Sequence, residues 1–328
     1  METPKISIET GVHRRENVKA VIKDLGDIFI SRVKEANTIF IKVNLVHHEH
    51  QLATTHVDAV RATLDKIREH TNTVVQVGDA SYSGTAAAFR NFGYHRLLEE
   101  YQNVELVDLN EGAFVEGRVI QADRTPRMIH RAKVAVSADL KISISPMKID
   151  DESGVSLSIK NWVMGTWMAP SRISAYGRVW ARWPFLDEPG SYAHHASLKE
   201  LYKDAPCDLA IIDGTVAMEG KGPVHGKPVA MNVVLASFDP LAADAVATTL
   251  MGIEAEDIGY LALAAEEDLG AIRLVKMVLP PALIMDLTRD FARPIGFHEF
   301  LQKWRGGLDD LQPVVIEKVL GGFEQEVV

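Results

Sequence analysis

Residues 139–165 read Asp-Leu-Lys-Ile-Ser-Ile-Ser-Pro-Met-Lys-Ile-Asp-Asp-Glu-Ser-Gly-Val-Ser-Leu-Ser-Ile-Lys-Asn-Trp-Val-Met-Gly. Ile142 and Ile144 alternate with serines, which predicts a strand that ends at Pro146, so that the chain turns out of the sheet just ahead of Lys148. Ligands bind at the carboxyl ends of the strands of an open α/β sheet. We therefore expect Lys148 and Lys160 in a ligand-binding crevice; ordinary lysines of a solvated loop are the alternative.

Strand-like runs alternate with helical patterns along the chain. The runs lie at 38–43, 74–77, 104–109, 133–144, 209–212 and 231–236, and helical spacing is seen at 56–70 and 241–250. This alternation predicts an α/β fold with a mostly parallel sheet flanked by helices, and leaves mixed pairing open. We place an α/β domain at residues 1–252 and a mainly helical C-terminal extension packed on it at 253–328, with helices expected at 258–269, 283–291 and 297–304.

The composition is that of a globular protein. The chain has 328 residues, 47% of them hydrophobic, and a formal charge of −10 without long blocks of like charge, which argues against nucleic-acid and membrane partners. No apolar run approaches the roughly 18 residues of a membrane span, and no signal-peptide pattern is seen, so we expect a cytoplasmic protein. Cys207 is the single cysteine, which excludes an internal disulfide and an all-cysteine metal cluster. A homo-oligomer is left open.

A lysine lies in the first long strand pattern, and two polar residues follow that strand. Lys42 lies inside the strand pattern, where an ammonium group is costly to bury unless it reaches a ligand or a partner. Thr54 or Thr55 is expected to cap the next helix, which would point backbone N–H groups at an anion in the crevice. Lys42, Asn44 and Thr55 are therefore candidate ligand-binding residues.

Three histidines in the same loop suggest a metal at first sight. His47, His48 and His50 have spacings of i, i+1 and i+3, which is no standard zinc pattern, and no cysteine is at hand. We predict no metal site and leave the cofactor unknown.

Two glycine-containing loops could bind an anion through backbone N–H groups. Gly78, Asp79 and Ser81 follow a strand and precede a helix-like segment. Gly220 and Gly222 lie in a second loop with basic residues at positions 221, 225 and 227. The second loop lacks the spacing of a Walker A motif, and a plain glycine-rich hairpin is the alternative.

The remaining candidates surround Lys160. Ser156, Ser158 and Asn161 lie in the same segment and are expected to contact the ligand. Asp213, after a strand, and Asp244, one turn into the helix that Asp239 should cap, are candidate orienting partners of the lysines. Lys160 and Lys148 could then serve as base or nucleophile.

A Trp/Arg-rich insertion covers residues 162–200. Four of the five tryptophans fall between 162 and 183, among prolines and arginines. Such a stretch is typical of a lid or an oligomer contact, and an aromatic satellite core is the alternative.

The order of several short motifs resembles the family known as domain of unknown function 362. The motifs are Lys42-Val-Asn-Leu-Val, Gly78-Asp-Ala-Ser, Gly154-Val-Ser-Leu-Ser-Ile-Lys160-Asn161, Ile212-Asp213-Gly214, Glu219-Gly-Lys-Gly-Pro223 and Asp239-Pro-Leu-Ala-Ala-Asp244. Members often carry a ferredoxin-like module, whose cysteine run this chain lacks. The family usually has proline in place of Val43 and histidine in place of Asp150.

A weaker resemblance runs to the N-terminal lobe of nickel-pincer lactate racemases. Pro146, Gly154, Ser156, Lys160 and Gly165 follow the order of that family's motif. The resemblance implies that Lys160 holds a nucleotide-derived cofactor. The match is incomplete, because residues 157 and 158 replace two glycines and residue 147 replaces a histidine.

These features favour a cytoplasmic enzyme that binds an anionic small molecule or a nucleotide-derived cofactor through Lys42, Lys148 and Lys160, with redox or isomerase chemistry. The dinucleotide-binding, nucleophile-elbow and zincin motifs are absent from the sequence. The alternative is a non-catalytic binding or assembly protein that docks a partner through residues 162–183.

Overall fold

The computed structural model describes residues 3–169, 171–174, 177–180, 182, 190–279, 281–294 and 296–306. One large mixed sheet forms the centre of the molecule, with strand order β1-β13-β11-β7-β2-β3-β4. Its strands are β1 (Ser7–Thr10), β2 (Ile39–Val43), β3 (Val75–Asp79), β4 (Val104–Asp108), β7 (Leu140–Asp150), β11 (Leu209–Glu219) and β13 (Val233–Ser237). The neighbours from β11 to β4 pair in parallel, whereas β1 and β13 add antiparallel pairing at one edge. The predicted α/β class with a mostly parallel sheet is confirmed.

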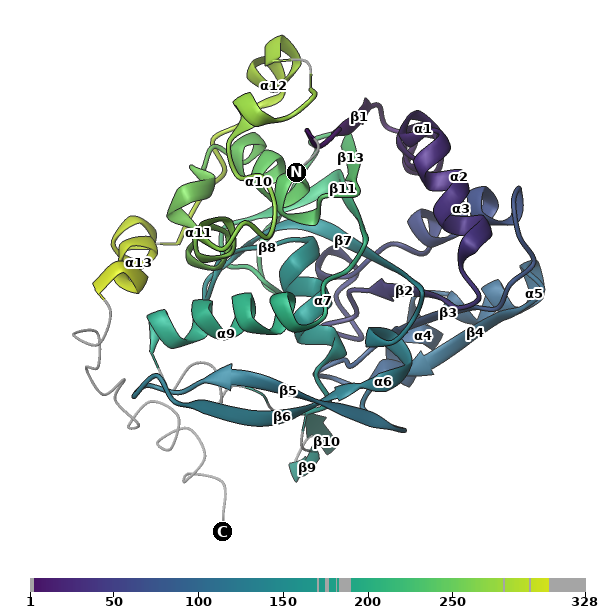
Figure 1. Ribbon diagram of the computed structural model, residues 1–328, viewed down its shortest axis with the longest axis horizontal. Coiled ribbons are helices and arrows are strands. Elements are labelled where there is room, and N and C mark those ends of the chain that lie inside the picture. The colour runs from purple at the N-terminus through teal and green to yellow at the C-terminus, as the bar shows by residue number, and fades with distance from the viewer. Residues whose placement is uncertain are drawn as a thin grey trace.

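Short strands and hairpins extend this sheet. β8 (Gly154–Ser156) pairs with the end of β7, and β12 (Lys227–Val229) pairs with the end of β11. Two separate hairpins are formed by β5 (Phe114–Ile120) with β6 (Pro126–Ala132) and by β9 (Ser171–Ser174) with β10 (Gly177–Trp180). The β5–β6 hairpin crosses the lower side of the molecule beneath α9 (Ser191–Asp204) (Figure 1).

Helices cover both faces of the sheet. One face carries α1 (Arg14–Leu25), α2 (Asp27–Glu35), α3 (Val57–Arg68), α4 (Thr85–Asn91) and α5 (Leu97–Glu100). The other carries α6 (Lys133–Val136), α7 (Ser158–Thr166), α9, α10 (Pro240–Leu250), α11 (Gly259–Glu266), α12 (Pro281–Leu287) and α13 (Phe297–Lys303). Short 3₁₀ turns lie at Gln51–Ala53, Tyr94–Arg96, Ala255–Asp257 and Leu274–Lys276.

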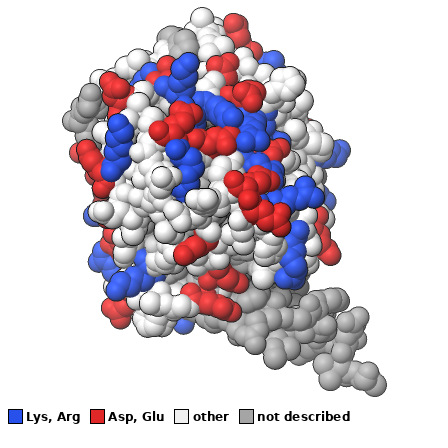
Figure 2. Space-filling model, turned by 90° about the vertical axis from the view of Figure 1, so that its right-hand side faces the viewer, with Lys and Arg blue, Asp and Glu red and all other residues white. Residues whose placement is uncertain are grey.

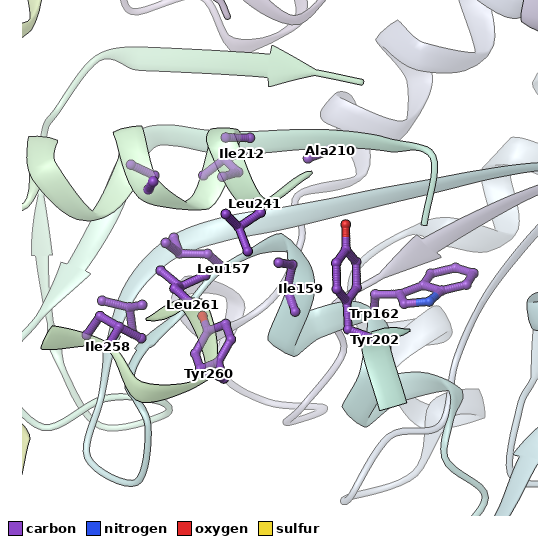
Figure 3. Close-up of a cluster of buried hydrophobic side chains, with 14 of the residues drawn as sticks. Leu157, Ile159, Trp162, Tyr202, Ala210, Ile212, Leu241, Ile258, Tyr260 and Leu261 are labelled. Atoms are coloured by element: carbon purple, nitrogen blue, oxygen red, sulfur yellow. The ribbon is translucent and has the colours of Figure 1, made fainter. Parts of the chain in front are cut away.

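Each face has its own hydrophobic core, because successive strand residues point to opposite sides. Ile41 and Ile211 face the α1–α3 side, whereas Phe40 and Ile212 face α7 and α10. Figure 3 shows the second core, in which side chains from α7, α9, α10 and α11 meet on one face of the sheet. Residues of the C-terminal extension up to Leu301 belong to this same core.

Two segments differ from the prediction, and one hairpin was not predicted. Pro146 does not end its strand: β7 continues to Asp150, and Pro146 lies beyond the last residue that pairs with β2 but still opposite Asp213 of β11. Residues 133–136 form α6 instead of a strand. The β5–β6 hairpin was not expected, although its alternating burial is typical of an exposed two-stranded sheet.

The face that carries α1, α3 and α5 mixes charges of both signs (Figure 2). Asp65 of α3 pairs with Arg15 and Lys19, and Arg61 pairs with Asp58 and Glu100. Among the described helices, none has the length and apolar character that crossing a bilayer requires.

Candidate functional site

A buried ion pair lies where β2 and β3 end. The Lys42 Nζ is 2.7 Å from Asp79 Oδ1 and donates to Asn161 Oδ1 at 2.8 Å, and all three side chains are buried. Asp79 Oδ2 accepts from the Leu45 N–H. Burial lowers the pKa of Lys42, although the Asp79 carboxylate opposes the shift. Three residues that the sequence suggested as ligand-binding candidates, Lys42, Asp79 and Asn161, thus lie side by side at the carboxyl edge of the sheet.

Gly165 of α7 leaves the space that this pair occupies. A Cβ atom on Gly165 would lie 1.8 Å from Lys42 Cε and 2.3 Å from Asp79 Oδ1. The glycine is therefore required by close packing of the helix on the ion pair and not by its backbone dihedral angles.

We expect Gly165→Ala to lower the free energy of unfolding by about 1–3 kcal/mol, because the added methyl group must displace Lys42 from Asp79. Helix propensity alone predicts the opposite sign, a gain of about 1 kcal/mol. Urea denaturation of the natural chain and of Gly165→Ala decides between these two expectations. A more stable variant would show that Lys42 and Asp79 are not rigidly held.

Lys148 is buried without a carboxylate partner among the described residues. Its Nζ donates to the carbonyl oxygens of Ala53, at 2.9 Å, and Pro223, at 3.2 Å. These carbonyls belong to the loops that follow β2 and β11, so the ammonium group joins the two loops. Burial, together with the smaller effect of the nearby positive charges of Lys160 and Lys42, lowers the pKa of Lys148 to about 7, against the attraction of Asp150.

Lys160 pairs with Asp150 and not with Asp213 or Asp244. The Lys160 Nζ lies 2.5 Å from Asp150 Oδ1, which also accepts from the Ser153 backbone and hydroxyl. Burial alone would raise the pKa of Asp150, but the Lys160 ammonium outweighs it and the pKa is lowered. Sequence reasoning missed Asp150 as a partner, although its position two residues after Lys148 in one strand was a usable signal.

Arg182 brings a fourth buried cation to the same edge. Its guanidinium donates to the carbonyl oxygens of Ala80 and Trp167, and no described carboxylate pairs with it. Burial lowers the pKa of Arg182 to about 10, and the charge of Asp79 opposes this shift. Arg182 comes from the Trp/Arg-rich insertion, so this part of the insertion packs against the candidate site.

The described part of the site carries more buried positive than negative groups. Lys42, Lys148, Lys160 and Arg182 are each less than 10% exposed, whereas only Asp79 and Asp150 oppose them with comparable burial at this edge. Burying an unpaired charge is costly unless the group loses its proton or meets a counter-ion. The arrangement can therefore either accept an anion or hold Lys148 as a neutral amine.

Asp244 stabilises the start of α7 and does not orient a lysine. Its Oδ1 accepts from the Ser158 N–H at 2.8 Å and from the Ser158 hydroxyl, and its Oδ2 accepts from the Ile159 N–H at 3.0 Å. Burial raises the pKa of Asp244 to about 7, although these hydrogen bonds oppose the shift. The expected pairing with a lysine is wrong because the free N–H groups at the helix start bind this carboxyl group.

Asp213 lies on the opposite face of the sheet. Its Oδ2 is 2.5 Å from Arg14 Nε of α1, and its Oδ1 accepts from the Thr215 N–H. The expectation that Asp213 orients a catalytic lysine is therefore wrong, since odd-numbered residues of β11 point toward α1 up to this position.

Several other candidates have structural explanations. A Cβ on Gly78 would lie 2.5 Å from the Val107 carbonyl oxygen, so Gly78 permits close strand packing. The Thr55 hydroxyl donates to the Ile144 carbonyl and accepts from the Asn44 N–H, whereas His56 caps α3 in place of Thr54 or Thr55. The Ser81 hydroxyl donates to the Leu45 carbonyl.

The second glycine loop lies directly on β7. A Cβ on Gly222 would be 1.8 Å from the Ile149 carbonyl oxygen, so a side chain there would push the loop away from Lys148. Gly220 has a φ of +78°, a conformation that favours glycine, and its surroundings are open. Ser156 is buried opposite Lys148 in the β7–β8 pair.

Histidines of the loop after β2 lie against a histidine of the second glycine loop. The ring centroids of His47 and His50 are 4.4 Å apart, and His225 of the second loop lies 5.3 Å from His50. Burial, followed by the other imidazoles, lowers the pKa of His47. Across the described residues, no three His, Cys, Asp or Glu side chains are arranged to hold a metal ion.

Residues 39–249 match the model of the family Domain of unknown function (DUF362). This segment holds every lysine of the site and most of the sheet. The chain belongs to the DUF362 family.

Two further proteins show similarity to this DUF362 chain. A thylakoid-associated protein, sll1697, from Synechocystis sp. is 25% identical over 258 residues, which cover 77% of this chain and 74% of the relative. The lactate racemase apoprotein from Thermoanaerobacterium thermosaccharolyticum is a solved structure with 14% identity and a TM-score of 0.49, over 75% of this chain. The chain spans 57% of the length of that racemase.

The described part of the Trp/Arg-rich segment lies inside this DUF362 chain. Trp162 and Trp167 are at most 1% exposed, and Arg182 is 8% exposed. Trp183, part of the segment expected to dock a partner, lies outside the described residues. Trp162, Trp167 and Arg182 are therefore unavailable to a docking partner in this conformation.

Proposed function

We propose that the chain is an enzyme that binds an anionic small molecule at the carboxyl edge of the sheet and uses Lys148 for proton transfer. The single observation that carries this proposal is the buried Lys148 side chain, whose hydrogen-bond acceptors among the described residues are two backbone carbonyls and whose pKa is lowered to about 7. An amine with a pKa near neutrality can both accept and donate a proton at working pH.

The excess of buried positive groups supports an anion as the ligand. A phosphate or carboxylate group placed beside Lys148 would offset a buried charge with which no described carboxylate pairs. Proton transfer by a lysine fits isomerase or redox chemistry on that ligand, and a nucleotide-derived cofactor held by Lys160 is compatible with both. We propose a cytoplasmic location for this enzyme.

Titration calorimetry with inorganic phosphate and, separately, oxalate tests the proposal. At pH 8 we expect the natural chain to bind at least one of them with uptake of a proton, because the anion restores the ammonium form of Lys148. The proton uptake appears as a binding heat that depends on the ionisation heat of the buffer. Lys148→Met should weaken binding by about tenfold or more and remove the buffer dependence.

Lys141→Met is the matched control, because Lys141 lies near the start of the same strand and pairs with Asp208 in a less buried position. The control should bind as the natural chain does. If neither anion binds at millimolar concentration, or if both variants bind alike, the proposed role of Lys148 is wrong.

A further inference from the structure

A second polar cluster lies beside the Asp150–Lys160 pair. His195 of α9 is buried, and its Nδ1 accepts from the Tyr260 N–H at 3.2 Å. Burial lowers the pKa of His195 well below its usual value, so the ring is neutral. A neutral ring whose Nδ1 accepts a hydrogen bond carries its proton on Nε2. His195 therefore presents a fixed Nε2–H donor.

Three buried polar atoms of this cluster lack a hydrogen-bond partner among the described residues. They are His195 Nε2, the Tyr260 hydroxyl and Asp150 Oδ2. Buried polar groups are almost always hydrogen-bonded, to water or ligand where protein atoms do not serve. His195 Nε2–H is a donor, Asp150 Oδ2 is an acceptor, and the Tyr260 hydroxyl can be either, so each of the three can still form a hydrogen bond.

The Tyr260 N–H donates to His195 Nδ1, and Ile258 and Gly259 link these two residues to the β7–β8 turn that holds Asp150. Asp150 pairs with Gly154 across the β7–β8 turn, and a Cβ on Gly154 would lie 2.6 Å from Ile258 Cδ1. A Cβ on the next residue, Gly259, would lie 2.6 Å from the His195 ring. Burial raises the pKa of Tyr260, with smaller contributions from the charges of Asp244 and Asp150, and the charge of Asp150 opposes the lowered pKa of His195. Figure 3 shows the Tyr260 ring beside Ile258 and Leu261 in the surrounding core.

We propose that His195, Tyr260 and Asp150 form a binding site for one O–H group, supplied either by a ligand hydroxyl or by an ordered water. The O–H oxygen accepts from His195 Nε2–H, its hydrogen is donated to Asp150 Oδ2, and the Tyr260 hydroxyl completes the set. Because Asp150 Oδ1 binds Lys160, this site adjoins the lysines, and the ligand arm of the inference rests on the proposed function.

Tyr260→Phe tests the site, because it removes only the hydroxyl oxygen. If an O–H group binds there, we expect the thermal midpoint Tm to fall by about 2–4 °C, the shift for one lost buried hydrogen bond. Tyr94→Phe is the matched control, since the Tyr94 hydroxyl is equally buried and donates to the Thr55 carbonyl at 2.8 Å. An unpartnered hydroxyl would instead leave Tm unchanged or raised in Tyr260→Phe, which would overturn the inference.

Native mass spectrometry of the purified full chain separates the two sources. A bound mass that is present in the natural chain and lost in Tyr260→Phe identifies a ligand hydroxyl. A fall in Tm without any bound mass identifies an ordered water. Either result is independent of the phosphate and oxalate titrations, so the proposed function can fail while this site stands.

Discussion

Asp79→Asn is expected to lower the free energy of unfolding by about 3–5 kcal/mol, the largest effect of any single change discussed for this chain. The substitution keeps the size of the side chain but removes the charge that lies 2.7 Å from the buried Lys42 ammonium. The amide of the variant has one acceptor oxygen in place of two, so it can accept from the Lys42 ammonium or from the Leu45 N–H but not from both. In either case no negative charge at this position opposes the buried ammonium. Urea denaturation at pH 7 measures the loss.

The double variant Lys42→Met/Asp79→Leu is the control for this experiment. Removing both charges leaves neither partner uncompensated, so we expect the double variant to be more stable than Asp79→Asn. A cost below about 1 kcal/mol for the single change would mean that the pair is solvated and that the edge of the sheet is open to water.

The second large effect is a pH dependence that depends on Lys148. Unfolding returns the pKa of Lys148 from about 7 to its ordinary 10.5, so between these values the unfolded chain binds more protons than the folded chain. The free energy of unfolding must therefore rise with pH in this window and fall as the pH drops toward 7. Between pH 6 and pH 9 we expect a rise about 3 kcal/mol larger in the natural chain than in Lys148→Met.

The comparison with Lys148→Met cancels the other titrating groups, including Asp244, whose raised pKa has the opposite consequence for stability. Measurements in chloride buffers avoid competition by phosphate. Equal pH profiles for the two chains would show that Lys148 keeps its proton in the fold, and would remove the physical basis for its acid–base role.

The large-scale fold was predictable because hydrophobic periodicity reports burial directly. The strands at 39–43 and 209–212, and the α10 helix with its Asp239 cap and following Pro240, agree with the pattern in the sequence. Pro146 misled the prediction, since whether a proline ends a strand depends on what its neighbour strand does at that level. Which strands lie beside Pro146 is known only from the three-dimensional structure.

The candidate site was predictable only in part for the same reason. Lys42 was a candidate as a lysine inside a strand and Asp79 as part of a glycine-containing loop; that the two meet follows from the parallel pairing of β2 with β3. The partner of Lys160 was expected to be Asp213, after a strand, or Asp244, one turn into a helix, yet Asp150 of β7 pairs with it. His195 and Arg182 gave no local signal, since an isolated histidine in a helix or an arginine in an irregular segment is commonplace.

The edge strand β1 has a practical consequence for anyone who expresses the family region alone. β1, α1 and α2 all precede residue 39, where the family match begins, yet β1 pairs with β13 and the two helices fill one core. A fragment trimmed to residues 39–249 would leave the outer edge of β13 without a partner strand and expose aliphatic side chains of β2 and β11. Such an edge recruits other chains, so the trimmed fragment should precipitate or misassemble where the longer chain remains in solution.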